Sequence, residues 1–249
     1  DKTFQLVLLL IENEACKKIN QILPSKEKNL FLITRLENEM TTIVGIQGDG
    51  FTILCSDSRI STVDDDGYVS YVQTLSPSMS KIAQVGPYLI GIAGDLRAIN
   101  LINYAFQPPI PPAAMKGRKL DEFITLKFVS ALRECFDSNG YSPPPKESSD
   151  HVAQQGSSII ISVNRMIYQI DNDYAWTTDA SGLYAIGTGT YYALGALNIL
   201  CPKMPTLTQA KRHVLKALST ASKYDPHTGH PYKTYVQDST SIKVRKAIQ

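Results

Sequence analysis

Residues 41–54 read TTIVGIQGDGFTIL, and this stretch decides the fold. Its two halves are rich in β-branched and other strand-forming residues. Asp49-Gly50, between the halves, is a favoured pair for a two-residue hairpin turn. The stretch therefore predicts a β-hairpin whose first strand begins at a Thr-Thr pair and whose second strand runs on toward Arg59.

Thr41 gains a specific chemistry if the chain is cut after Met40. The residue would then carry both a hydroxyl nucleophile and a free α-amine. An α-amine has an unperturbed pKa of about 7.7–8.0, so near neutrality much of it can act as a base. Because a Thr-Thr pair is also common in ordinary strands, this interpretation depends on the rest of the chain.

Further motifs follow the Thr-Thr pair in a defined order. An acidic residue lies sixteen positions after Thr41, and an arginine follows two residues later. A lysine then precedes two strands, and a Gly-Thr-Gly and an Asp-x-x-Thr-Gly motif come late in the chain. These positions are Asp57, Arg59, Lys81, Gly91, Thr188, Asp225 and Thr228. From roughly Thr41 to Val236 the chain resembles the proteasome β-type subunits and the HslV-like or Anbu-like threonine peptidases, which are N-terminal nucleophile hydrolases.

The resemblance implies a catalytic role for each position. Thr41 is the nucleophile, and Lys81 supplies a positive charge that lowers the pKa of its amine and its hydroxyl. Asp57 orients and neutralises Lys81, because an unpaired buried ammonium would be costly. The backbone N–H of Gly91 is the oxyanion donor. The amine and a water are held by a polar shell of Thr188, Asp225 and Thr228.

Substrate recognition is expected in the strand that contains Gly91. By position, Leu89, Gly91 and Ala93 line the pocket for the side chain before the cut bond. Leu89 and Ala93 are neutral, which indicates a preference for apolar or small substrate residues there.

The sequence also departs from the family pattern. Thr188 and Thr228 replace serines, so their hydroxyls keep the same hydrogen bonds only if there is room for the added methyl groups. His230 replaces a glycine beside the expected site. The segment from Ser61 to Ser78 is longer than usual.

Each motif has a structural interpretation as well. Asp57 and Arg59 suit a surface ion pair, and Lys81 suits a solvated lysine on an edge strand. Gly187-Thr188-Gly189 suits a turn with a helix N-cap, and Asp225-Pro226 suits a turn. Their joint order and spacing favour the catalytic interpretation.

Composition gives little reason to expect other classes of function. A net charge of +2 does not point to nucleic acid or a membrane surface as a partner. Four scattered cysteines have no metal-ligand spacing, so we expect neither a metal nor another cofactor. A reduced, cytoplasmic setting fits this cysteine content. No hydrophobic run reaches transmembrane length.

We expect one hydrolase domain over residues 41–238, with an N-terminal extension or propeptide (1–40) and a C-terminal tail (239–249). The extension lacks the basic start and small-residue cleavage site of a signal peptide. An alternative is that Met40 is the natural start, so that its removal alone exposes Thr41.

Periodicity predicts helices at residues 96–105, 119–136, 190–200 and 208–223, and further strands at 157–163, 166–170, 183–186 and 232–236. In the second helix the apolar side comprises Phe123, Leu126, Phe128, Val129 and Leu132. This order suits two antiparallel sheets packed face to face with helices outside. The resemblance likewise implies an α+β fold, a four-layer αββα sandwich.

The predicted function is that of a threonine endopeptidase, which hydrolyses peptide bonds of unfolded polypeptides after residues 1–40 are removed. The resemblance implies a homo-oligomeric ring and an ATP-dependent unfoldase as a partner. Two alternatives stay open. One is a catalytically silent subunit with a structural or assembly role, and the other is a small-molecule amidase of the same superfamily.

Overall fold

Two five-stranded antiparallel sheets form the centre of the computed structural model, which describes residues 41–63, 69–141, 156–238 and 242–245. The extension predicted at residues 1–40 lies outside the described residues. The first sheet has the order β10-β1-β2-β11-β12 and the second the order β5-β6-β7-β8-β9. The first comprises β1 (Thr42–Gly48), β2 (Phe51–Ser56), β10 (Leu183–Gly187), β11 (Lys233–Gln237) and β12 (Ile242–Arg245). The second comprises β5 (Ile82–Val85), β6 (Tyr88–Ala93), β7 (Ser158–Val163), β8 (Met166–Ile170) and β9 (Trp176–Thr177).

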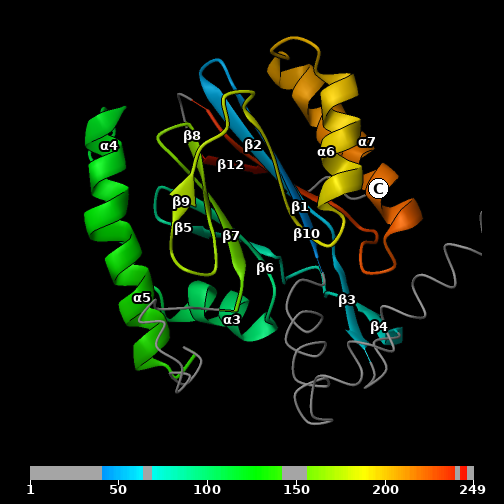
Figure 1. Cartoon of the computed structure of the whole chain (residues 1–249), viewed down its shortest axis with the longest axis horizontal. Coiled ribbons are helices and arrows are strands. Elements are labelled where there is room, and N and C mark those ends of the chain that lie inside the picture. The colour runs from blue at the N-terminus through cyan, green and yellow to red at the C-terminus, as the bar shows by residue number, and fades with distance from the viewer. Residues whose placement is uncertain (1–40, 64–68, 142–155, 239–241, 246–249) are drawn as a thin grey trace, which may run out of the picture.

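Helices cover the outer face of each sheet, as Figure 1 shows. The first sheet packs against α6 (Thr190–Leu200) and α7 (Leu207–Tyr224). The second packs against α3 (Leu96–Tyr104), α4 (Arg118–Phe123), a π-helical turn η1 (Ile124–Phe128) and α5 (Val129–Ser138). A third apolar cluster, which includes Ile43, Leu54, Leu89 and Ile160, lies between the two sheets. The predicted α+β, four-layer αββα fold is confirmed.

Local turn chemistry explains the predicted hairpin at residues 41–54 and the hairpin formed by the predicted strands 157–163 and 166–170. Gly48 pairs with Phe51 across the Asp49-Gly50 turn, and Gly50 has φ +73°. Asn164 and Arg165 join β7 to β8 with φ 49° and 63°. Positive φ at both Asn164 and Arg165 is the signature of a type I′ turn, whose twist matches that of the strands. In the Asp49-Gly50 turn only Gly50 has positive φ, a conformation that favours glycine.

A separate hairpin projects beyond the sheets where the sequence is longer than the family pattern. It consists of β3 (Arg59–Val63) and β4 (Val69–Thr74). The structure also adds β12 as an edge strand paired with β11, within the region predicted to be a tail. This short strand carries no strong sequence signal, which is why the prediction missed it.

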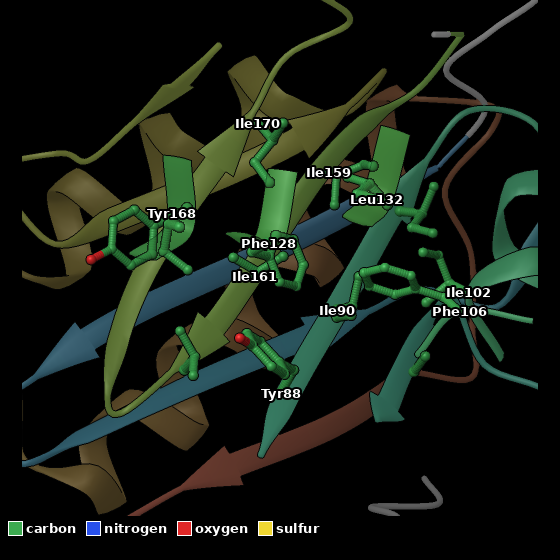
Figure 2. Packing of buried hydrophobic residues seen from close by; sticks show 14 of the residues in the cluster. Tyr88, Ile90, Ile102, Phe106, Phe128, Leu132, Ile159, Ile161, Tyr168 and Ile170 are labelled. Carbon is green, nitrogen blue, oxygen red and sulfur yellow. The ribbon is translucent and has the colours of Figure 1, made fainter. Parts of the chain in front are cut away.

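The predicted helix 119–136 is present, but its buried side differs from the prediction. Leu126 is 67% exposed, so placing it on the apolar face was wrong. The buried residues follow an i, i+4 row: Leu120, Ile124, Phe128, Leu132 and Phe136. In a regular α-helix each four-residue step drifts by about 40° around the axis. The wider π turn of η1 offsets that drift, and Phe128 and Leu132 thus meet Ile161 and Ile90 of the second sheet (Figure 2).

The predicted helix 208–223 corresponds to α7, which begins at the expected cap. Thr206 Oγ1 accepts from the backbone N–H of Gln209, and the Gln209 side chain accepts from the backbone of Thr206. This reciprocal capping box satisfies donors that the first turn leaves open. At its other end α7 stops at Tyr224, and Asp225 follows as the C-cap. The helix therefore delivers Asp225 to the start of β1.

Candidate active site

Asp57 and Lys81 form a buried ion pair at the end of β2. Lys81 Nζ lies 2.7 Å from Asp57 Oδ1, and the two side chains are 1% and 0% exposed. Lys81 Nζ also donates to the carbonyl oxygen of Arg59 at 2.5 Å. Asp57 is therefore not part of a surface ion pair with Arg59, and Lys81 is not a solvated edge-strand lysine, because both side chains are buried.

Four donors converge on the carboxylate of Asp57. Oδ1 accepts from Lys81 Nζ and from the Thr42 N–H at 3.1 Å. Oδ2 accepts from the Arg59 N–H at 2.9 Å and the Gly229 N–H at 3.1 Å. Burial raises the pKa of Asp57 and lowers the pKa of Lys81, and the ion pair opposes both shifts. Asp57 thus connects β1, β3, the lysine and the loop after α7.

Thr41 lies directly before β1 and is only 2% exposed. Its carbonyl oxygen faces Gly187, where an added Cβ would lie 1.9 Å away. Gly187 also has φ +94°, so both space and backbone conformation call for glycine there. The close approach explains the first glycine of the Gly-Thr-Gly motif.

The second threonine of the pair holds the polar cluster together. Thr42 Oγ1 lies 2.5 Å from Thr228 Oγ1 and 3.5 Å from Asp225 Oδ2. It also accepts from the Gly189 N–H at 3.0 Å, and an added Cβ on Gly189 would lie 2.2 Å from it. Thr42 had no predicted role, although its position beside Thr41 was the available signal.

The predicted polar shell is assembled around Asp225. Thr188 Oγ1 donates to Asp225 Oδ2 at 2.7 Å and approaches the Thr41 carbonyl oxygen at 3.5 Å. Thr228 Oγ1 also donates to Asp225 Oδ2. Both threonines therefore keep the hydrogen bonds expected of the serines that they replace, and their methyl groups are accommodated.

Solved structures share this arrangement of sheets and helices. Thiobacillus denitrificans BPH, a bacterial proteasome homologue, in complex with epoxomicin has a TM-score of 0.60 at 17% identity, covering 81% of this chain and 100% of that chain. Another structure of the same protein has a TM-score of 0.58 at 18% identity, with the same coverage. Eukaryotic HslV from Trypanosoma brucei has a TM-score of 0.51 at 19% identity, covering 80% and 99% of the two chains. The fold is that of the proteasome-like N-terminal nucleophile hydrolases. No family model and no curated protein sequence matches the chain.

Within this proteasome-like fold, Gly91 lies outside the polar cluster around Asp225. It pairs with Ile82 and Ile160 in the middle of the second sheet. A Cβ there would lie 2.8 Å from the Ile160 side chain and 3.0 Å from that of Ile43. Gly91 therefore permits close packing of the two sheets, and its predicted oxyanion role has no geometric support.

The other predicted pocket residues lie at different depths. Leu89 and Ala93 belong to the cluster between the sheets, and both are 0% exposed. Ala93 Cβ lies 3.3 Å from the Cβ position of Gly187, which in turn faces the Thr41 carbonyl. Ala93 therefore lies close to Thr41 at the end of β6, whereas Leu89 lies further back along β6, among apolar side chains.

His230 does not crowd the cluster. Its ring is exposed and stacks on Tyr232 with a centroid distance of 4.0 Å. The neighbouring Gly229 lies against the guanidinium of Arg59, where an added Cβ would be 2.4 Å from Nε. Arg59 also donates to the Pro226 carbonyl oxygen at 2.8 Å, which fixes the loop after α7.

Two features often linked to other functions are missing from the described part of the chain. Within residues 41–63, 69–141, 156–238 and 242–245, no group of three or more His, Cys, Asp or Glu side chains could hold a metal ion. Over those same ranges, no helix has the length and apolar character needed to cross a membrane.

Proposed function

We propose that this chain is a threonine endopeptidase of the proteasome β type, with Thr41 as the nucleophile once residues 1–40 are removed. The observation that carries the proposal is the buried Lys81–Asp57 pair, which is bonded to the start of β1 through the Thr42 N–H. A buried cation beside a residue with both a hydroxyl and an amine is an arrangement that activates a nucleophile.

The proposed reaction uses groups that are bonded to the start of β1, beside Thr41. Lys81 has three N–H donors, and Asp57 and the Arg59 carbonyl accept two of them. The third is then available to the Thr41 hydroxyl, and the positive charge lowers the pKa of that hydroxyl and of the amine.

The chemistry then proceeds through an acyl-enzyme. The Thr41 hydroxyl oxygen attacks the peptide carbonyl carbon while the α-amine takes the hydroxyl proton. That proton passes to the leaving amine as the C–N bond breaks, which leaves an ester on Thr41. A water then attacks the ester carbon while the α-amine takes its proton. The ester C–O bond breaks, the carboxylic acid product leaves, and the proton returns to the Thr41 oxygen. Thr188 and Asp225 would hold the amine and this water.

Gly94 replaces Gly91 as the proposed oxyanion donor. The Ile92 N–H donates to the Lys81 carbonyl, so it points toward β5. Backbone N–H groups alternate in direction along a strand, and the N–H of Gly94 therefore faces the same side, just past Ala93. Gly94 has φ +137°, a conformation that favours glycine. A preorganised N–H at this position suits a developing oxyanion.

The wider assembly belongs to the same proposal. The proteasome-like fold supports a homo-oligomeric ring, a polypeptide substrate, an ATP-dependent unfoldase as a partner and a cytoplasmic location. The position of Ala93 beside Thr41 supports a preference for apolar or small residues before the cut bond. Fluorogenic peptides that favour acidic or basic residues at that position would contradict the preference.

The test begins with the intact mass of the full chain after incubation. We expect a species that starts at Thr41, peptide cleavage by that species, and a mass adduct with epoxomicin. Thr41→Ala should abolish all three, Thr41→Ser should keep partial cleavage, and Thr178→Ala, at an exposed threonine, should match the parent.

A second arm separates processing from chemistry. A full chain with a site-specific protease sequence placed before Thr41 is folded first and then cut. If the cut chain cleaves no peptide and forms no adduct, the peptidase proposal fails and the silent-subunit alternative holds. Turnover of simple amides without peptide cleavage would instead favour the amidase.

A further inference from the structure

Lys233 is a buried lysine at the start of β11. It is 7% exposed and pairs with Ser56, which in turn pairs with Ile43. Residues paired across antiparallel strands point to the same face, and Ile43 belongs to the cluster between the sheets. Lys233 therefore points between the two sheets, where a charged residue is rarely buried unless its charge is satisfied.

The ammonium of Lys233 binds the backbone of one turn. Nζ donates to the carbonyl oxygens of Ser76 at 3.3 Å and Pro77 at 3.0 Å, and also to that of Met79. Residues 76–79 form a β-turn in which the Met79 N–H donates to the Ser76 carbonyl at 3.0 Å. An ammonium has three donors, and three carbonyls of this one turn accept from it.

The turn leads directly to Lys81. Ser80 is the next residue, and its side-chain oxygen accepts from the backbone N–H of Ile82 at 3.1 Å. On its other side the Lys81 carbonyl accepts from the Ile92 N–H at 3.0 Å. Lys233 of β11 thus holds the backbone just before Lys81, and Ile92 of β6 holds the carbonyl of Lys81 itself. The turn needs this support because residues 76–78 are exposed.

We propose that Lys233 is a positioning residue that fixes the turn at residues 76–79 and, through it, the ammonium of Lys81 beside Thr41. This inference rests on the proposed peptidase function. Lys233 acts on the reaction only through Lys81, so its loss should slow the chemical step and leave substrate binding unchanged. A misplacement of a catalytic group by about 1 Å can lower a rate by about a hundredfold.

The experiment compares three substitutions in the full chain. Lys233→Met has a similar length but no donors, Lys233→Arg keeps the charge and the donors, and Lys216→Met is a control at an exposed lysine of α7. We measure kcat and KM on a peptide with an apolar residue before the cut bond. For Lys233→Met we expect kcat to fall by about 10- to 100-fold with KM within about twofold. Lys233→Arg should recover much of the loss, and Lys216→Met should match the parent.

Amide hydrogen exchange, followed by mass spectrometry, provides a readout that does not need activity. Faster exchange over residues 76–82 in Lys233→Met, with α7 unchanged, supports the role of Lys233 in holding the turn. Exchange equal to that of the parent overturns it, as does a change in KM alone. An inactive parent would contradict the peptidase proposal, while the exchange data would still decide the structural role. If Lys233→Met does not fold, Lys233→Gln, which keeps two donors without the charge, replaces it in both assays.

Discussion

Replacing Asp57 with asparagine should strongly destabilise the fold, because the carboxylate accepts from four donors at once. An amide has only one acceptor oxygen. If that oxygen faces Lys81, the NH₂ group faces the N–H groups of Arg59 and Gly229. Two hydrogen bonds to a charged acceptor are then lost, at about 1.5–3 kcal/mol each.

The ion pair adds a second contribution to the same change. Removing one partner of a buried pair typically costs about 3–5 kcal/mol, since the other charge stays buried. The two contributions overlap, so we expect a loss of about 3–6 kcal/mol in the free energy of unfolding for Asp57→Asn. At about 2–4 °C per kcal/mol for a domain of this size, Tm should fall by roughly 6 °C or more.

Urea denaturation of the parent and variants measures this effect. Glu122→Gln is the matched control, because Glu122 pairs with Arg118 at 3.1 Å on an exposed helix surface. It should change the free energy of unfolding by less than about 1 kcal/mol. The double variant Asp57→Asn/Lys81→Met should be more stable than Asp57→Asn alone, since it removes the unpaired charge. A loss below about 1 kcal/mol for Asp57→Asn, or simple additivity in the double variant, would refute the reasoning.

Three further predictions concern the core, the thiols and pH. Phe128→Ala should lower the free energy of unfolding, measured by urea denaturation, by about 3–5 kcal/mol. Leu126→Ala, at a residue that is 67% exposed, should change it by less than about 0.5 kcal/mol. Similar losses for the two variants would contradict the buried face described for α4, η1 and α5. Burial raises the pKa of the Cys55 thiol to about 12, so iodoacetamide at pH 8 should label Cys55 only after the protein unfolds. Cys201 is partly exposed and should react in the native protein. Burial lowers the pKa of Lys81 from its ordinary value of 10.5. As the pH rises, the ammonium therefore loses its proton before pH 10.5 is reached, and peptidase activity should decline with it. A rate that stays constant up to pH 10.5 would contradict a role for the cation.

Local signals made most of the fold predictable. Asp49-Gly50 forms its hairpin turn from its own backbone preferences, and Thr206 with Gln209 starts α7 by a capping box four residues long. Such signals need no knowledge of distant residues. The error at Leu126 arose because a π-helical turn shifted the buried row, and no simple apolar period describes that shift.

The site was less predictable, because it depends on which residues meet across the fold. Asp57 and Lys81 were predicted together from a family pattern, and their contact spans 24 positions. Gly91 and Gly94 lie in one short segment, and only the packing of β6 on β1 distinguishes them. Lys233 contacts carbonyls more than 150 positions earlier in the chain, and backbone acceptors leave no trace in a sequence.

Strand geometry explains why two adjacent threonines are both present at the site. Successive side chains of a strand point to opposite faces. Thr42 shares its face with Val44, which packs toward α6 and α7, so its hydroxyl meets the Asp225 cluster on the helix side. Continuing the alternation by one residue directs Thr41 to the face of Ile43, between the sheets. Thr41 therefore lies on the side where Ala93 and the Lys81 segment meet. Thr42 connects the strand to the residues that would hold the α-amine of Thr41.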